Sequence, residues 1–435
     1  MITRRQALRS SLFGAGLVGL RALATGLPTA LLLNPKKALA DMPACPTPTK
    51  AQYVILATTG LGDPINASVP GTYDDPGIYH SKDPAMAASP LTLAGQSTTA
   101  AMPWSKLPQD VLDRTTFWHL MTNTPVHPKE GEVLKLMGAT EGGEMLPSLL
   151  SRHLAPCLGT IQTQPISLGA VNPVEALTYG GLALPVIPAL ALKATLTNAA
   201  GPLTNLQPLR DQTLNQLYDI YKNGATKAQQ QYIDSLVTSQ AQVRNIRQDL
   251  LNELSTITDN SINSQILAAV ALIQMKVTPV LAVHIPFGGD NHRDINLADE
   301  TSQTISGVAA IGSLMSQLKA AQLQDQVTVM SLNVFGRTLN ASNTDGRSHN
   351  PNHQVSFTIG TPFRAGVVGG VAPVGGDYGA VAIDSKTGKA ASGGDVAAVD
   401  TLASFGQTML AGLGVAPDAI SREVTKGKVI AGALT

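Results

Sequence analysis

The chain of 435 residues carries 30 basic and 30 acidic side chains, so its formal net charge is zero, and residues 1–40 hold six of the basic and none of the acidic ones. Without residues 1–40 the formal charge is therefore −6, and nucleic acid and anionic membrane surfaces are not expected partners. The length predicts one large elaborated domain or two domains.

The segment 1–40 has the composition of an export signal: a basic start, a moderately apolar middle and a small-residue site at 38–40. Thr3–Arg9 resembles the twin-arginine pattern, although Ala7 stands where an aromatic residue is commoner. The alternative is an uncleaved membrane helix, but Arg21 leaves the apolar stretch short of the ~20 residues needed to span a bilayer. We expect a twin-arginine signal peptide recognised by its export machinery, and residues 41–435 in the periplasm or secreted.

The chain has two cysteines, Cys45 and Cys157, and both follow the expected signal peptide. In an oxidising compartment they could form one disulfide that ties the N-terminal arm to the body. Two separate thiols are the alternative. The spacing of the two cysteines matches no metal-binding motif.

Short apolar runs that end in glycine or polar loops predict strands, and longer segments between them predict helices. In chain order, strands are expected near 51–60, 115–120, 277–285, 326–336 and 354–360, and helices near 261–275, 296–323 and 395–414. Strands that alternate with long helices predict an α/β fold with a mostly parallel central sheet and helices on both faces. We expect residues 41–435 to form a single large α/β domain.

The segment 202–258 differs from the rest, because it is polar and its apolar residues recur every three or four positions. This spacing predicts two amphipathic helices separated at Gly224. We interpret them as a helical insertion packed on the sheet, which could also bind a protein partner. A dimerising coiled coil is the alternative, but strict heptads are not sustained.

Three polar loops follow predicted strands, and parallel strands bring their carboxyl ends to one edge of a sheet. These loops carry the residues that we predict as metal ligands: Asp63, Asp290, His292, Asp345, His349 and His353. Carboxylate and imidazole suit a divalent metal such as zinc, manganese, iron or, with carboxylates, calcium. One or two such ions could polarise a phosphoryl or sulfuryl oxygen.

Each of these residues also has a purely structural interpretation. Asp63 before a proline is typical of an Asx turn, Asp290 and His292 could cap the next helix, and the spacing of His349 and His353 in a loop carries little information. His80, His119, His153 and His284 are expected to be structural. Serine hydrolase, nucleotide-binding and zinc-peptidase signatures are missing from the sequence. Thr124, near His127, is the predicted nucleophile.

The order of these motifs resembles the domain-of-unknown-function family 1501, whose members look like distant relatives of the alkaline phosphatase and sulfatase superfamily. The family's Gly-Gly-Trp-Asp-Thr-His is matched at four positions of Gly288–His292, without the tryptophan. Its Ser-Glu-Phe-Gly-Arg-Thr is matched at Phe335–Thr338, but Asn333 and Val334 replace the serine and glutamate. In Gly346–Asn350 the histidine is kept, while the acid of Gly-Thr-Asp-His-Gly is lost.

The resemblance implies an alkaline-phosphatase-like fold and an exported metal-dependent hydrolase that acts on phosphate or sulfate esters. The replaced acids would have supplied charge to a metal site, so a one-metal site is an alternative to a two-metal one. A catalytically silent periplasmic binding or assembly protein on the same scaffold is the competing hypothesis.

Overall fold

The computed structural model describes residues 53–58, 62, 64–158, 164–169, 177–197, 207–227, 229–230, 233–234, 237–238, 248–287, 289–340 and 345–435. The expected signal peptide, Cys45 and Asp63 lie outside the described residues. Cys157 is disulfide-bonded, which fits the first of the two alternatives for this cysteine. In the part of the chain that the structure describes, no helix is both long and apolar enough to cross a membrane.

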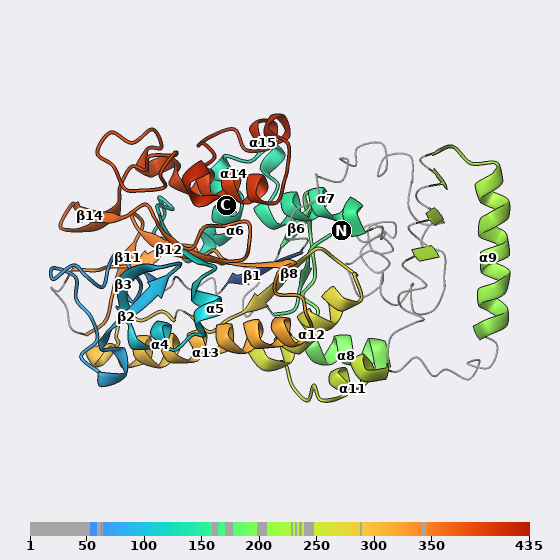
Figure 1. Ribbon diagram of the computed structural model, residues 1–435, viewed down its shortest axis with the longest axis horizontal. Coiled ribbons are helices and arrows are strands. Elements are labelled where there is room, and N and C mark those ends of the chain that lie inside the picture. The colour runs from blue at the N-terminus through green and yellow to red at the C-terminus, as the bar shows by residue number, and fades with distance from the viewer. Residues whose placement is uncertain are drawn as a thin grey trace, which may run out of the picture.

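A seven-stranded mixed sheet forms the centre of the molecule (Figure 1). Its strand order is β13 (Gly366–Val368), β4 (Thr115–Leu120), β12 (Gln354–Ile359), β9 (Val327–Ser331), β1 (Tyr53–Thr58), β8 (Val280–His284) and β5 (Ile166–Ser167). Within this sheet β12 runs antiparallel to both of its neighbours, and the other six strands run parallel to one another. The predicted α/β fold with a mostly parallel central sheet is confirmed.

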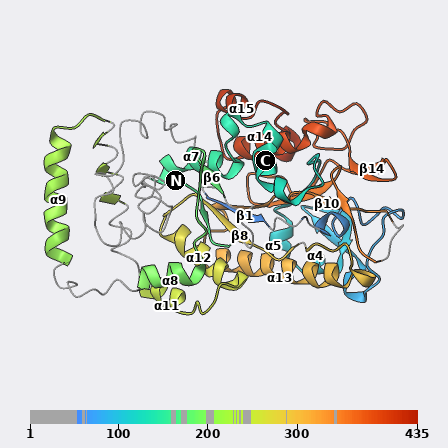
Figure 2. The ribbon, with the colours of Figure 1, turned by 180° about the vertical axis from the view of Figure 1, so that it is seen from behind.

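Helices cover both faces of the sheet, as predicted (Figures 1 and 2). One face packs on α4 (Met102–Ser105), α5 (Gln109–Leu112), α8 (Ala189–Thr197), α11 (Gln248–Ser255), α12 (Ile262–Gln274) and α13 (Ala298–Ala320). The other face packs on α6 (Glu130–Leu134), α7 (Leu146–Leu158), α14 (Thr401–Gly412) and α15 (Pro417–Glu423). Alternate residues of β1 point into the two cores, which is why its sequence is an unbroken apolar run.

Four two-stranded pairs decorate this core. They are β2 (Ala88–Leu93) with β3 (Gln96–Ala101), β6 (Thr178–Tyr179) with β7 (Leu182–Ala183), β10 (Gly336–Arg337) with β11 (His349–Asn350), and β14 (Val371–Val374) with β15 (Asp377–Ala380). The pair β10–β11 matters most for function, because it fixes the loop that carries His349 directly before β12.

The long helix α13 begins where the loop after β8 ends. Both carboxylate oxygens of Asp294 accept hydrogen bonds from the first turn, from the backbone N–H groups of Asp299 at 2.8 Å and Glu300 at 2.9 Å. These N–H groups have no partner inside a helix, so the aspartate satisfies them as a cap does. The loop that holds Asp290 and His292 is thereby tied to a rigid helix.

The predicted helical insertion 202–258 is described in part. Helix α9 (Gln207–Asn223) ends one residue before Gly224, as expected, and lies at one end of the molecule, away from the sheet (Figures 1 and 2). Helix α11, in contrast, packs on α8 and α12 and adds Leu250 and Leu254 to the core. The antiparallel arrangement between them falls partly outside the described residues.

Candidate functional site

Polar side chains from three segments meet at the edge of the sheet where the parallel strands end. The loop after β8 carries Asp290 and His292, and the loop after β4 leads into a 3-10 helix that begins at His127. His349 comes from β11, directly before β12. Since β12 runs antiparallel, its first residues lie at the edge where the other strands finish.

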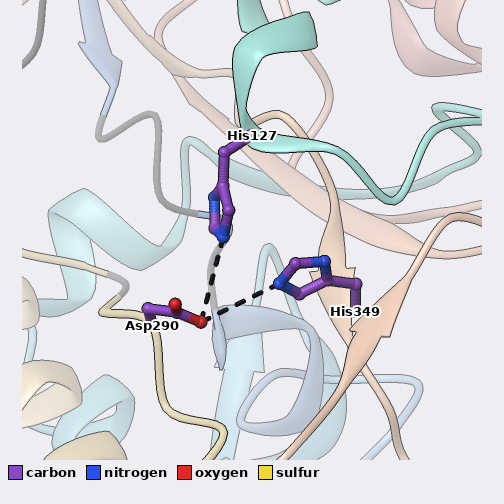
Figure 3. Close-up of side chains that lie close together, drawn as sticks. All are labelled: His127, Asp290 and His349. Atoms are coloured by element: carbon purple, nitrogen blue, oxygen red, sulfur yellow. Dashed lines mark ion pairs between the residues drawn. The ribbon is translucent and has the colours of Figure 1, made fainter.

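His127, Asp290 and His349 point toward one another (Figure 3). The Oδ1 atom of Asp290 lies 3.8 Å from Nε2 of His127 and 3.8 Å from Nε2 of His349. One ligand atom from each residue lies within 4.8 Å of the other two. This is the spacing of groups that could bind a single metal ion from different sides.

A fourth side chain, His292, lies beside these three residues. Its Nε2 lies 3.2 Å from Asp290 Oδ1 and 2.8 Å from His349 Nε2. Ligand atoms of a tetrahedral zinc ion, each about 2.0–2.1 Å from the metal, lie roughly 3.3 Å apart. The separations of 3.8 Å from Asp290 Oδ1 to Nε2 of His127 and to Nε2 of His349 are somewhat longer than that value.

The backbone orients His349 for metal binding. Its Nδ1 lies 2.5 Å from the carbonyl oxygen of Pro125, and because a carbonyl only accepts, Nδ1 is the protonated nitrogen. The other nitrogen, Nε2, therefore presents its lone pair to Asp290 and His292. Metal-binding histidines commonly have this outer hydrogen bond, which fixes their tautomer and ring orientation.

Arg337 binds the carboxylate of Asp290 from the protein interior. It is fully buried, and its guanidinium donates to Asp290 Oδ1 at 3.2 Å and to the carbonyl of Gly289 at 2.8 Å. Partial burial acts to raise the pKa of Asp290, but the charge of Arg337 and the nearby His292 imidazole outweigh it, so the pKa lies below its usual range. Asp290 is therefore ionised at neutral pH.

His349 has the protonation state that a metal ligand needs. Burial, helped by the Arg337 charge, holds the pKa of His349 below its ordinary value, although the hydrogen bond to Pro125 opposes the shift. Its imidazole is thus neutral near pH 7. A neutral imidazole beside an ionised carboxylate is a ligand pair that binds divalent metals without first losing a proton.

An aromatic side chain packs against the two inner imidazoles. The ring centroid of Phe335 lies 4.2 Å from that of His349 and 4.9 Å from that of His127. Phe335 is completely buried. The cluster is consequently apolar on one side and open on the other, where Asp290 and His292 are about half exposed.

The remaining predicted site residues do not join this cluster. His353 is fully buried, and its ring nitrogens bond to His119 and Asn66 instead. Asp345 has an exposed side chain, and its carbonyl accepts a hydrogen bond from Asp294. Thr124 is buried, and its Oγ1 accepts from the backbone N–H of Val126 at 3.4 Å, the geometry of a local turn.

Two residues of the site, His127 and Arg337, have no site role predicted from the sequence. His127 stands seven residues after β4, on the same edge as the other loops, and this position is the signal that could have identified it. Arg337 stands out in the sequence only as part of the Phe335–Thr338 motif. Its burial beneath Asp290 follows from the β10–β11 pairing, which neither propensity nor apolar periodicity reveals.

The fold and the site define an α/β protein with an imidazole–carboxylate cluster at the carboxyl edge of a mostly parallel sheet. Residues 195–388 match the model of the family described as "Protein of unknown function (DUF1501)". The match includes Asp290, His292, Arg337 and His349, and it ends before the C-terminal helices begin. No curated protein matches the chain.

Proposed function

We propose that the chain is a member of this family, with an alkaline-phosphatase-like fold, and that it is an exported metal-dependent hydrolase of phosphate or sulfate esters. The observation that carries the proposal is the convergence of His127, Asp290 and His349 on one point. Loops at the carboxyl ends of parallel strands are where α/β enzymes bind their ligands.

The chemistry of the donor set fits a divalent metal. Imidazole nitrogens together with one carboxylate are the ligands of catalytic zinc sites and also suit manganese and iron. Calcium prefers an all-oxygen shell, and Asp290 is the cluster's only carboxylate among the described residues, so the fit to calcium is poorer. The cluster supports one ion rather than two, which agrees with the replaced acids at Asn333 and Val334.

A bound ion would polarise the phosphoryl or sulfuryl oxygen of the ester. Arg337 holds the Asp290 carboxylate in place, and Phe335 keeps water from the inner side of His127 and His349. Thr124 Oγ1 accepts a local hydrogen bond from Val126, so we favour direct attack by water. The bond from the water oxygen to phosphorus or sulfur would form as the ester bond to the alcohol breaks, with the proton of the water lost to solvent and the departing alkoxide protonated by solvent.

The test is elemental analysis and ester hydrolysis by the full chain, alongside an Asp290→Ala/His349→Ala variant. We expect near-stoichiometric zinc, manganese or iron in the wild-type chain, loss of that metal in the variant, and metal-dependent cleavage of p-nitrophenyl phosphate or sulfate. Asp345→Ala is the matched control, because this aspartate is exposed in a neighbouring segment. Metal-free, inactive wild-type protein that stays so after addition of each divalent ion would overturn the proposal.

The export proposal has its own test. Residues 1–40 should direct a folded reporter out of the cytoplasm, and Arg4→Lys/Arg5→Lys should abolish this transport if the route is the twin-arginine one. Export that persists in the double variant would contradict the twin-arginine assignment.

A second candidate function is favoured by the surface of α9. Large apolar side chains are exposed on this helix, namely Leu209 (62%), Leu217 (41%), Ile220 (69%) and Tyr221 (67%). Such a surface is typical of protein-binding helices. A catalytically silent binding or assembly protein would use it, and co-purification from periplasmic extract that is lost in Leu209→Ser/Ile220→Ser/Tyr221→Ser would support this alternative.

A further inference from the structure

Two buried histidines that the proposed reaction does not use, His119 and His353, are hydrogen-bonded to each other. Nδ1 of His119 is 2.9 Å from Nε2 of His353, and Nε2 of His119 is 3.0 Å from the carbonyl oxygen of Pro70. On the other side, Nδ1 of His353 is 3.4 Å from Nδ2 of Asn66. A continuous hydrogen-bonded chain thus crosses from η2 (Pro64–Ala67) to the end of β4.

The hydrogen bonds of this chain can run in only one donor-to-acceptor direction. The Pro70 carbonyl only accepts, so His119 carries its proton on Nε2 and accepts at Nδ1. His353 must then donate from Nε2, which leaves its Nδ1 as an acceptor for the Asn66 amide. Both imidazoles are neutral in this arrangement, and every bond has one donor and one acceptor.

Asn66 connects this hydrogen-bonded chain to Arg337, which binds Asp290. Its amide nitrogen has two hydrogens, and the second donates to the carbonyl oxygen of Arg337 at 2.7 Å. Its Oδ1 accepts from the backbone N–H of Arg337 at 3.1 Å. The asparagine therefore grips both polar backbone groups of the residue whose guanidinium holds Asp290.

The side chains of this hydrogen-bonded chain are closely packed and have no space to take another orientation. Asn66, His119, His353 and Arg337 are all fully buried. A Cβ atom at Gly71 would lie 2.6 Å from His119 Nε2, and one at Gly336 would lie 2.7 Å from Asn66 Nδ2. Glycine is required at both positions for the close approach, and the fixed amide orientation leaves Arg337 one backbone position.

We propose that His119, His353 and Asn66 are positioning residues, which hold Asp290 in its metal-binding orientation through the backbone and guanidinium of Arg337. This inference rests on the proposed metal site. None of the three touches a cluster ligand in any hydrogen bond of the described structure, so their effect on the metal passes through Arg337. Outer residues that orient metal ligands typically change metal affinity by about 10–100-fold.

The experiment measures Co²⁺ and Zn²⁺ affinity of the full chain by calorimetry in four variants. Asn66→Asp removes both donated hydrogen bonds but keeps the acceptor for Arg337, and His353→Phe removes both ring nitrogens. His353→Gln keeps one acceptor and one donor and serves as the conservative rescue. His153→Gln is the matched control, because His153 is a buried histidine that bonds Glu423 on the opposite face of the sheet.

We expect Asn66→Asp and His353→Phe to weaken metal binding tenfold or more, with His353→Gln and His153→Gln within a few fold of wild type. Equal affinities in all variants would overturn the proposal. The same holds if His153→Gln weakens binding as much as the others, since the effect would then be general destabilisation.

A second readout separates this inference from the proposed function. If the wild-type chain binds neither ion, the metal-dependent function fails, and ¹⁵N spectra of the histidine rings and of the Arg337 guanidinium decide the positioning role. Both rings protonated at Nε2, with Arg337 resonances that shift in Asn66→Asp but not in His153→Gln, support the chain of hydrogen bonds. Rings in another tautomer, or unshifted Arg337 resonances, contradict it.

Discussion

The two buried imidazoles give the protein a characteristic response to acid. Burial lowers the pKa of His119 to about 4, and burial together with the neighbouring ring places the pKa of His353 well below its ordinary value. In the unfolded chain both groups titrate near 6.5. Between these values the unfolded state binds protons that the folded state does not, so stability falls as the pH is lowered.

We therefore expect the free energy of unfolding to be flat above about pH 6.5 with respect to these groups, and to decline below it by up to about 1.4 kcal/mol per pH unit for each imidazole. Urea unfolding at pH 7.5, 6.5 and 5.5 measures this slope. The His119→Gln/His353→Gln double variant should have a shallower decline than wild type. An identical slope in the two proteins would show that these histidines are already charged in the folded state.

Arg347 and Glu300 form a second buried group, which the proposed chemistry does not use. Nε of Arg347 lies 2.6 Å from Oε2 of Glu300, and both side chains are almost completely buried. The guanidinium also donates to the carbonyls of Thr338 and Tyr79. This pair fixes the segment before His349 to α13.

Removal of one partner of this pair leaves an uncompensated buried charge. We expect Arg347→Met to lower the free energy of unfolding by about 3–5 kcal/mol. Arg347→Met/Glu300→Leu should recover a large part of that loss, as the thermal unfolding of the single and double variants can show. A double variant no more stable than the single one would contradict the view that the lone charge is the cause.

At the scale of elements, the cap on α13 links helix stability to the site. Asp294→Ala removes the two hydrogen bonds to the first turn and should cost about 0.5–2 kcal/mol of unfolding free energy. Asp294→Asn keeps an acceptor and should lose less. Because Asp294 stands two residues after His292, the alanine variant should also weaken metal binding, whereas Asp299→Ala in the same helical turn should not.

Element positions were largely predictable from the sequence, because buried strands are apolar runs and helices have a periodic pattern. The expected strand 115–120 is β4 without a shift, and the expected helix 261–275 is α12 within one residue at each end. The antiparallel direction of β12 was not predictable, since an apolar run is compatible with a parallel or an antiparallel strand. Hairpin β2–β3 is exposed and polar along much of its length, and was missed for that reason.

The candidate site was predictable only in part. Asp290, His292 and His349 were found because each stands in a loop beside a predicted strand. His353 has the same signal but points inward to His119, because β12 begins at the next residue and buries it. His127 stands in a short segment between Pro125 and Pro128, and its approach to Asp290 depends on contacts across more than 150 residues, which no local pattern contains.

For the whole molecule, the exposed face of α9 leads to a prediction about association. If α9 binds a partner or a second copy, Leu209→Ser/Ile220→Ser/Tyr221→Ser should remove that association without change in metal content, because α9 lies away from the sheet edge (Figure 1). Sedimentation of the full chain and variant at matched concentrations measures this. Identical behaviour of the two would leave α9 without a role in self-association.

The position of β1 has a consequence for how the protein acquires its structure. This strand pairs with β8 and β9, so Val54 lies opposite Val280 and Thr328. The pairing of β1 with β9 joins residues more than 270 positions apart in the sequence. Such distant pairings form slowly. The cluster at the sheet edge needs β4, β8 and β11 in place around this central strand, so the ability to bind metal should appear at the end of folding, after most helices have formed.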